Sequence, residues 1–272
     1  MKARAVIEVV LVFAAIWLII ALVGLSPVGE WERQITGRFN FIEYTLIIVI
    51  TLLVLVVTRK NLASYGVSFR NLRYHLDIAF TAFLPVALGF IPIALIGDNH
   101  KTWWGSLIMA GVKVAVLFLL GWMLRRKPTR NESGIIAGAF LFLAFSNLTQ
   151  RAPSDNPVFG FIYYILFLGF GEELLFRGYI QSRLNEAWGR PFQFYGVPWG
   201  WGLIITSVIF GLMHVINIGT LINGNWQLAP WWGLWTFFSG LVGGFVREKT
   251  GSIVAPSILH GLPQAISTAF GF

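Results

Sequence analysis

Two adjacent carboxylates lie inside a long apolar stretch, in the run Phe170-Gly-Glu-Glu-Leu-Leu-Phe-Arg-Gly-Tyr179. On a helix, Glu173 and Arg177 are four residues apart with the acid first, which is the favoured orientation for an ion pair. Glu172 points about 100° away from Glu173. We therefore expect Arg177 to neutralise Glu173 while Glu172 faces a cavity. An ion pair at a helix end would explain Glu173 and Arg177 but leaves the second carboxylate unexplained.

Two of the four histidines, His214 and His260, also lie inside apolar stretches. One buried histidine is more often a core residue than a catalyst, but two of them beside an unneutralised carboxylate suggest chemistry. A glutamate and two imidazoles can activate water, because they supply a base, a group that shares the proton and a group that stabilises an oxyanion. The same three side chains could instead bind Zn²⁺.

The composition identifies the environment of these residues. Of 272 residues, 56% are apolar and only 12% are charged, and the mean hydropathy is +0.72. Such a chain cannot cover itself with polar surface in water, which excludes a soluble globular protein, a disordered chain and a coiled coil. The chain has no cysteine, which excludes disulfides and thiolate metal sites. The class that fits is a polytopic membrane protein.

Apolar runs long enough to cross the bilayer predict an all-α membrane bundle of eight or nine helices. We expect one transmembrane domain over 1–272 with no separate soluble domain. The predicted spans are 5–25, 41–58, 77–97, 104–124, 133–150, 158–181, 201–219, 231–246 and 253–270. The longest predicted loops are 26–40, 59–76, 182–200 and 220–230.

Basic residues are distributed unevenly between the two sides of this bundle. With nine spans, one side holds 14 of the 20 lysines and arginines: Lys2, Arg4, Arg59, Lys60, Arg70, Arg73, Arg125, Arg126, Lys127, Arg130, Arg183, Arg190, Arg247 and Lys249. The positive-inside rule places that side, and with it the N-terminus, in the cytoplasm. The same rule explains the net charge of +8 without nucleic acid as a partner.

Further charges fall within the predicted spans. Glu8 and Glu43 lie near span ends, and we expect them to reach towards the interface. Lys113 lies nine residues into its span, and we expect it to pair with Glu43. Glu172, His214 and His260 can all meet in the cytoplasmic half of the bilayer, judged by their distances along the helices.

The motifs Glu172-Glu173-x-x-x-Arg177, Phe210-x-x-x-His214 and His260 resemble, in order and spacing, those of the type II CAAX prenyl endopeptidases. These are the Rce1-like members of the CPBP/Abi intramembrane protease family. The resemblance covers about 158–270, which we expect to be the catalytic core. It implies an all-helical membrane peptidase with a cavity open to lipid and cytosol.

The resemblance also implies roles for individual residues. Glu172 and His214 would activate water, Glu173 and Arg177 would support them, and His260 would hold the oxyanion. Two further supporting residues are expected: Gln264, at a position where the family often has Asn, and Asn217. We expect no cofactor, with Zn²⁺ as the less favoured alternative.

The implied substrates are prenylated or other membrane-associated peptides and proteins, with loss of a C-terminal tripeptide. The implied location is the cell membrane of a prokaryote or the endoplasmic reticulum of a eukaryote.

Two readings from other functional classes stay open. A proton-coupled transporter could use Glu172 and the histidines as a relay, although no inverted repeat is visible. A non-catalytic membrane scaffold or immunity protein would not need Glu172 at all. Other intramembrane proteases fit poorly, because the chain has no HExxH motif and Ser239 lies in Phe-Phe-Ser-Gly rather than in a Gly-x-Ser-Gly motif.

Overall fold

The computed structural model describes residues 2–37, 39–89, 91–97, 99, 102–125, 157–216 and 228–270. The helices up to residue 125 are α1 (Lys2–Gly24), α2 (Pro27–Thr36), α3 (Phe41–Val57), α4 (Leu72–Leu88), α5 (Ile91–Ile96) and α6 (Trp103–Arg125). The later α-helices are α8 (Pro157–Ile162), α9 (Phe170–Glu173), α10 (Ser182–Trp188), α11 (Trp201–Val215), α13 (Pro230–Thr250) and α14 (Val254–Phe270). Two π-helical segments, η3 (Tyr163–Gly169) and η4 (Leu174–Gln181), and two strands, β1 (Phe192–Phe194) and β2 (Val197–Trp199), complete the description.

The described residues form an all-α bundle with one small hairpin. Among them, three helices are long and apolar enough to cross a membrane: Lys2–Gly24, Trp103–Arg125 and Val158–Trp188. Two shorter apolar helices, Phe41–Val57 and Trp201–Val215, accompany them. The predicted all-helical membrane protein is thus supported, and the count of eight or nine spans stays a prediction. The predicted span 133–150 lies outside the described residues.

Three predicted boundaries differ from the structure. The predicted span 77–97 is two helices, α4 and α5, and α4 already contains Pro85 one turn before its end. The predicted loop 26–40 contains α2, which begins with a Ser26 side-chain cap and Pro27 in the first turn. The predicted loop 182–200 contains α10 and the antiparallel hairpin β1–β2.

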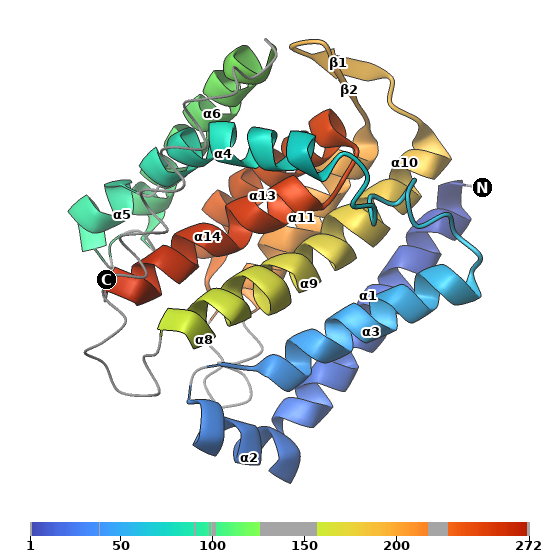
Figure 1. The fold of residues 1–272 in the computed structure, drawn as a ribbon, viewed down its shortest axis with the longest axis vertical. Coiled ribbons are helices and arrows are strands. Elements are labelled where there is room, and N and C mark those ends of the chain that lie inside the picture. Colours follow the sequence, from blue (N-terminus) through green and yellow to red (C-terminus); the bar gives the residue numbers. More distant parts are fainter. Residues whose placement is uncertain are drawn as a thin grey trace.

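The centre of the fold is the 31-residue helix over Val158–Trp188, which runs continuously from α8 to α10 (Figure 1). Its π-helical turns flank the four residues of α9, which carry both carboxylates. The wider turns of a π-helix are rare and often occur at functional sites. The carboxylates are therefore held between two irregular parts of one helix.

Two apolar clusters pack on this central helix. Helices α1 and α3 contact each other and the central helix and share one cluster with η4. Helices α4, α6, α13 and α14 share the other cluster with β2 and α11. In Figure 1, α13 and α14 lie between α6 and the α8–α10 helix. The acidic motif is thus buried where the two groups of helices meet.

Candidate functional site

Glu173 connects the first and third motifs of the chain. Its Oε1 accepts hydrogen bonds from Arg177 Nη1 at 2.8 Å and from His260 Nδ1 at 2.9 Å. The side chains of Glu173 and Arg177 are each only 2% exposed, so water does little to weaken their attraction. The predicted ion pair four residues apart is confirmed, and the same carboxylate also orients a histidine 87 residues later in the chain.

Glu172 points to different partners. Its Oε1 accepts a hydrogen bond of 3.0 Å from the Tyr44 hydroxyl of α3. Its Oε2 lies 3.7 Å from His260 Nε2, which is too far for a direct hydrogen bond. Within the described residues this buried Oε2 has no hydrogen-bond partner. Glu172 is therefore anchored by one oxygen, and the Oε2 atom of Glu173 is likewise buried without a partner within the described residues.

His214 is oriented by its own helix. Its Nδ1 lies 2.8 Å from the carbonyl oxygen of Phe210, one turn earlier in α11. Because a carbonyl oxygen only accepts, Nδ1 must donate, and a neutral His214 then presents Nε2 as an acceptor. The Phe210 ring lies close to both histidines, with ring centres 4.7 Å from His214 and 5.9 Å from His260. It also lies 4.7 Å from the guanidinium carbon of Arg177.

Glycines allow the helices that carry the motifs to approach one another. A Cβ at Gly169 would lie 2.6 Å from the Ser257 carbonyl oxygen of α14. A Cβ at Gly261 would overlap the Tyr164 carbonyl of η3. A Cβ at Gly243 of α13 would lie 3.0 Å from Arg177 Nη2. Backbone therefore touches backbone between α14 and the central helix, and this contact brings His260 to the carboxylates.

A cavity of about 190 Å³ opens at these groups. Its wall is mostly apolar and includes Val86, Val116, Trp232, Trp235, Val242 and Leu259. Its polar groups come from several helices: Glu173, Arg177, His214, Thr236, Ser239, His260, Gln264 and Lys113. An apolar cavity with a few convergent polar groups is typical of a ligand site. We expected Glu172 to face a cavity, but the carboxylate that lines this one is Glu173.

Of the two further supporting residues that we predicted, the structure describes one. Gln264 lies one turn after His260 on the cavity wall, and its buried Oε1 has no hydrogen-bond partner within the described residues. Asn217 lies outside the described residues. Sequence reasoning missed Tyr44, because nothing in the sequence connects a tyrosine in α3 with a carboxylate 128 residues later.

Glu43 and Lys113, which we expected to pair with each other, have different neighbours in the structure. Glu43 accepts a hydrogen bond from Asn40 Nδ2 at 3.3 Å. Lys113 lies on the cavity wall, with Nζ 6.0 Å from the centre of the Trp235 ring. The hydrogen bond of Glu43 therefore serves the start of its own helix, while Lys113 belongs to the candidate site.

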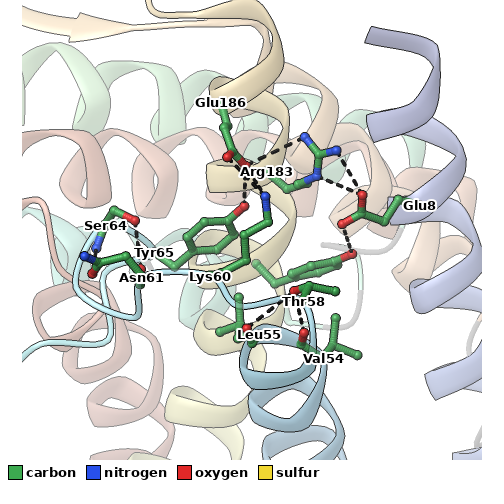
Figure 2. A network of polar contacts seen from close by, with 11 residues as sticks. Glu8, Val54, Leu55, Thr58, Lys60, Asn61, Ser64, Tyr65, Arg183 and Glu186 are labelled. Atoms are coloured by element: carbon green, nitrogen blue, oxygen red, sulfur yellow. Dashed lines mark hydrogen bonds and ion pairs between the residues drawn. The ribbon is translucent and has the colours of Figure 1, made fainter. Parts of the chain in front are cut away.

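Glu8 takes part in a polar network at one end of the central helix (Figure 2). It pairs with Arg183 Nη2 at 2.9 Å. Glu186 lies 2.8 Å from Lys60 Nζ and accepts a hydrogen bond of 2.6 Å from the Tyr65 hydroxyl. The count of basic residues assigns Lys60 and Arg183 to one side of the membrane, and here both pair with the same carboxylate. The network fixes the end of the central helix against α1 and the loop after α3.

The described residues contain no group of three or more His, Asp or Glu side chains arranged to hold a metal ion. The histidines and Glu173 are instead occupied by hydrogen bonds to protein groups. The arrangement places a carboxylate and two imidazoles on the wall of an apolar cavity.

Comparison with known proteins identifies the same part of the chain. Residues 154–266 match the sequence model of the family described as Type II CAAX prenyl endopeptidase Rce1-like. A search of curated proteins and a search of solved structures found no match. The matched segment contains Glu172, His214 and His260. The resemblance to the Rce1-like peptidase family is thus confirmed for the part of the chain that carries the candidate site.

Proposed function

We propose that this protein is an intramembrane endopeptidase that removes the C-terminal tripeptide from prenylated CAAX-type substrates. The observation that supports this most is the position of His260 between two adjacent carboxylates, 2.9 Å from Glu173 and 3.7 Å from Glu172. This arrangement lies on the wall of an apolar cavity and in the segment that matches a peptidase family.

In the proposed reaction, Glu172 is the general base. Its Oε2 takes a proton from a water molecule while the water oxygen attacks the scissile carbonyl carbon. His214 supports this step, because its Nε2 can accept a hydrogen bond from the same water. Tyr44 holds the other oxygen of Glu172 at 3.0 Å and so keeps Oε2 directed at the water.

The tetrahedral intermediate carries a negative charge on the former carbonyl oxygen. His260 donates a hydrogen bond from Nδ1 to Glu173, so it donates to this oxyanion from Nε2 in its imidazolium form, and the Gln264 amide one turn later is the second proposed donor. Collapse of the intermediate breaks the C–N bond, and the proton held by Glu172 passes to the leaving amine nitrogen. The products are a new C-terminal carboxylate and a free tripeptide.

Glu173 and Arg177 are positioning residues in this scheme. Glu173 fixes His260 through Nδ1 and is itself neutralised by Arg177. Arg177 is held further by the Gly240 carbonyl oxygen at 3.2 Å. Protonation of Glu173 would remove the charge that neutralises Arg177, so we assign Glu173 to positioning and not to proton transfer.

We propose that the reaction uses no metal ion. The proposal is supported by the donor set, because the imidazole nitrogens Nδ1 of His214 and His260 point at protein oxygens. Zn²⁺ at the two free Nε2 atoms and Glu172 is the alternative, and it would activate water as a Lewis acid.

The test is incubation of the purified protein with a farnesylated CAAX peptide and mass spectrometry of the products. We expect loss of the last three residues as one fragment. A second preparation carrying Glu172→Gln, which keeps the size of the side chain, should release none. If Glu172→Gln cleaves like the wild type, the proposed base is wrong. If the wild type cleaves no prenylated peptide, the peptidase proposal is wrong, and a scaffold or transporter becomes the better explanation.

A further inference from the structure

Helix α2 carries an exposed apolar face, and the proposed reaction does not use it. The helix begins three residues after the end of α1, and in Figure 1 it lies at the end of α1 that is away from the N-terminus. Val28, Trp31 and Ile35, which we call the apolar face of α2, are 51%, 59% and 66% exposed. Their spacings of three and four residues place them on one side of the helix. Large apolar side chains gathered on one side of a ten-residue helix mark a surface that meets a partner.

The remaining surface of α2 divides into a polar sector and a buried sector. Glu30 and Gln34 are exposed and lie one turn apart on the polar sector. Gly29 and Glu32 lie on the buried sector, and α2 contacts both α1 and α3. Counted along the helical turn, the centre of the apolar face is about 110° from the polar sector and about 100° from the buried one. Exposed apolar and exposed polar side chains are thus separated, as in a helix that lies along the surface of a bilayer.

Contacts with both neighbouring helices fix the rotation of α2. Arg33 Nη1 donates to the carbonyl oxygen of the last residue of α1 at 2.9 Å. The backbone N–H of Ile42, in the first turn of α3, donates to Glu32 Oε1 at 2.7 Å. A Cβ at Gly29 would lie 2.5 Å from the Val23 carbonyl oxygen, so only glycine allows this approach to α1. The apolar face therefore cannot turn inward without loss of these contacts.

The exposed surface of α1 leads directly to the apolar face of α2. Four leucines are exposed in this part of the chain: Leu11, Leu18, Leu22 and Leu25. Their spacings of seven, four and three residues place them on one side of α1 and of the residue that follows it. Helix α1 is long and apolar enough to cross a membrane, so this row of leucines would face lipid. The row ends three residues before Val28, and the lipid-facing surface therefore continues from α1 onto α2.

The charges of α2 indicate which part of a bilayer fits it. The helix has two acidic residues and one arginine, and the arginine side chain is bonded to α1. A helix that binds anionic headgroups is rich in lysine and arginine on its polar face, and α2 is not. Its partner is therefore the apolar layer just below the headgroups, whatever their charge. Trp31 suits this depth, because tryptophan is enriched at membrane interfaces.

We infer that α2 is an interfacial helix whose apolar face inserts into the lipid bilayer at the end of α1 opposite to the N-terminus. The polar sector faces water, and the helix axis follows the membrane surface. The ligand class is the acyl-chain and glycerol layer of a bilayer, zwitterionic and anionic alike. The inference goes beyond the proposed peptidase function and does not depend on it, because a scaffold or a transporter with this fold would bind lipid in the same way.

The test uses single cysteines in this cysteine-free chain. Val28→Cys and Ile35→Cys report on the apolar face, and Glu30→Cys and Gln34→Cys report on the polar sector. Each full-length variant is labelled with a small fluorophore and reconstituted into phosphatidylcholine nanodiscs, in which both membrane surfaces are accessible. Nitroxide-labelled lipids quench a fluorophore among the acyl chains, and iodide quenches one in water. We expect at least about twofold more lipid quenching on the apolar face than on the polar sector, and the reverse order with iodide.

The matched control is Leu18→Cys, at an exposed position within α1, which gives the reference signal for a side chain in lipid. Two positions on each sector keep the comparison valid if one variant does not fold. Equal lipid quenching on both sectors, or stronger iodide quenching on the apolar face, overturns the inference. Protection of the apolar face from both quenchers, together with disulfide-linked dimers, also overturns it, because a second copy of the chain would then cover the face. The same pattern in nanodiscs of anionic lipid supports the inference, whereas a pattern that requires anionic lipid overturns the assignment to the apolar layer.

Discussion

Replacing Glu173 with leucine removes a buried charge and leaves two donors without their acceptor. Arg177 Nη1 and His260 Nδ1 both bond to Glu173 Oε1, at 2.8 and 2.9 Å. After the change, Arg177 keeps the Gly240 carbonyl oxygen and the Phe210 ring, neither of which carries a negative charge. We therefore expect Glu173→Leu to be destabilising mainly because Arg177 stays buried without a counter-charge.

The size of the effect follows from the burial. Both side chains are 2% exposed, so no solvent screening reduces the interaction. Breaking such a pair by removing one partner costs about 3–5 kcal/mol, and a lost acceptor for His260 adds part of about 1–3 kcal/mol. The double variant Glu173→Leu with Arg177→Met removes both charges, and methionine fills an irregular space well. We expect the double variant to recover most of the loss, with a coupling energy of about 3 kcal/mol.

The measurement is equilibrium unfolding of the wild type, both single variants and the double variant in detergent micelles, followed by tryptophan fluorescence. Cleavage of a farnesylated peptide is measured on the same preparations. Glu173→Gln is the milder comparison, since its amide oxygen can still accept from Arg177 and His260. It should lose less stability than Glu173→Leu.

Two outcomes would contradict these assignments. If Glu173→Gln is as stable as the wild type and inactive, while Glu172→Gln still cleaves, then Glu173 is the base and the two carboxylates have been assigned in the wrong order. If the double variant is less stable than either single variant, the pair stabilises the fold in itself, and the cost does not come from an uncompensated Arg177.

Four further predictions concern the site and its membrane setting. Alanine at Glu172, His214 or His260 should each lower the rate of peptide cleavage by about 10²–10³ or more with the protein still folded, and a folded variant with wild-type kcat would remove that residue from the mechanism. Exhaustive chelation should leave cleavage intact, whereas loss of activity restored by added Zn²⁺ would count against a metal-free reaction. In this cysteine-free chain, a cysteine at the exposed Ser64 should be labelled only after permeabilisation and one at the exposed Gln34 in intact cells; the opposite pattern would invert the topology. Gly169→Ala should lower the unfolding temperature and the activity together, because its Cβ would lie 2.6 Å from the Ser257 carbonyl oxygen, and an unaffected variant would show that α14 can shift.

Much of the helical fold could be predicted, because a run of apolar residues long enough to cross a bilayer has few alternatives to a helix. The errors occurred where the chain forms short elements. Helix α2 is signalled by Ser26 followed by Pro27, a recognisable start that its polar composition obscured. The hairpin turns at Tyr195 and Gly196, both with positive φ, which is the geometry of a tight two-residue turn. The start of α2 and the hairpin turn are therefore both signalled in the sequence, by a helix cap and a turn dipeptide rather than by hydropathy.

The candidate site could be predicted only where its contacts are local. The pair Glu173–Arg177 follows from a spacing of four residues on one helix. The contacts of His260 with Glu173 and of Tyr44 with Glu172 join residues 87 and 128 positions apart, and no local pattern specifies them. They depend on π-helical turns and on glycines that bring α14 against the central helix. These contacts can be identified only when the positions of the helices are known.

The two adjacent carboxylates differ in the partners that each one holds, although the Oε2 atom of each is buried without a hydrogen-bond partner within the described residues. Glu173 faces the cavity but has two donors on Oε1, one of them from an arginine. Glu172 is anchored by Tyr44, and its Oε2 lies 3.7 Å from His260 Nε2 without a hydrogen-bond partner within the described residues. A substrate that enters from the cavity would meet His260 first, with the free oxygen of Glu172 close to the same imidazole. Water held by Glu172 Oε2 and His214 Nε2 would then attack the scissile carbonyl carbon, while Glu173 holds the His260 imidazole in place. This division of roles is why exchange of glutamate for glutamine at these two neighbouring positions should give opposite results, loss of chemistry at Glu172 and loss of stability at Glu173.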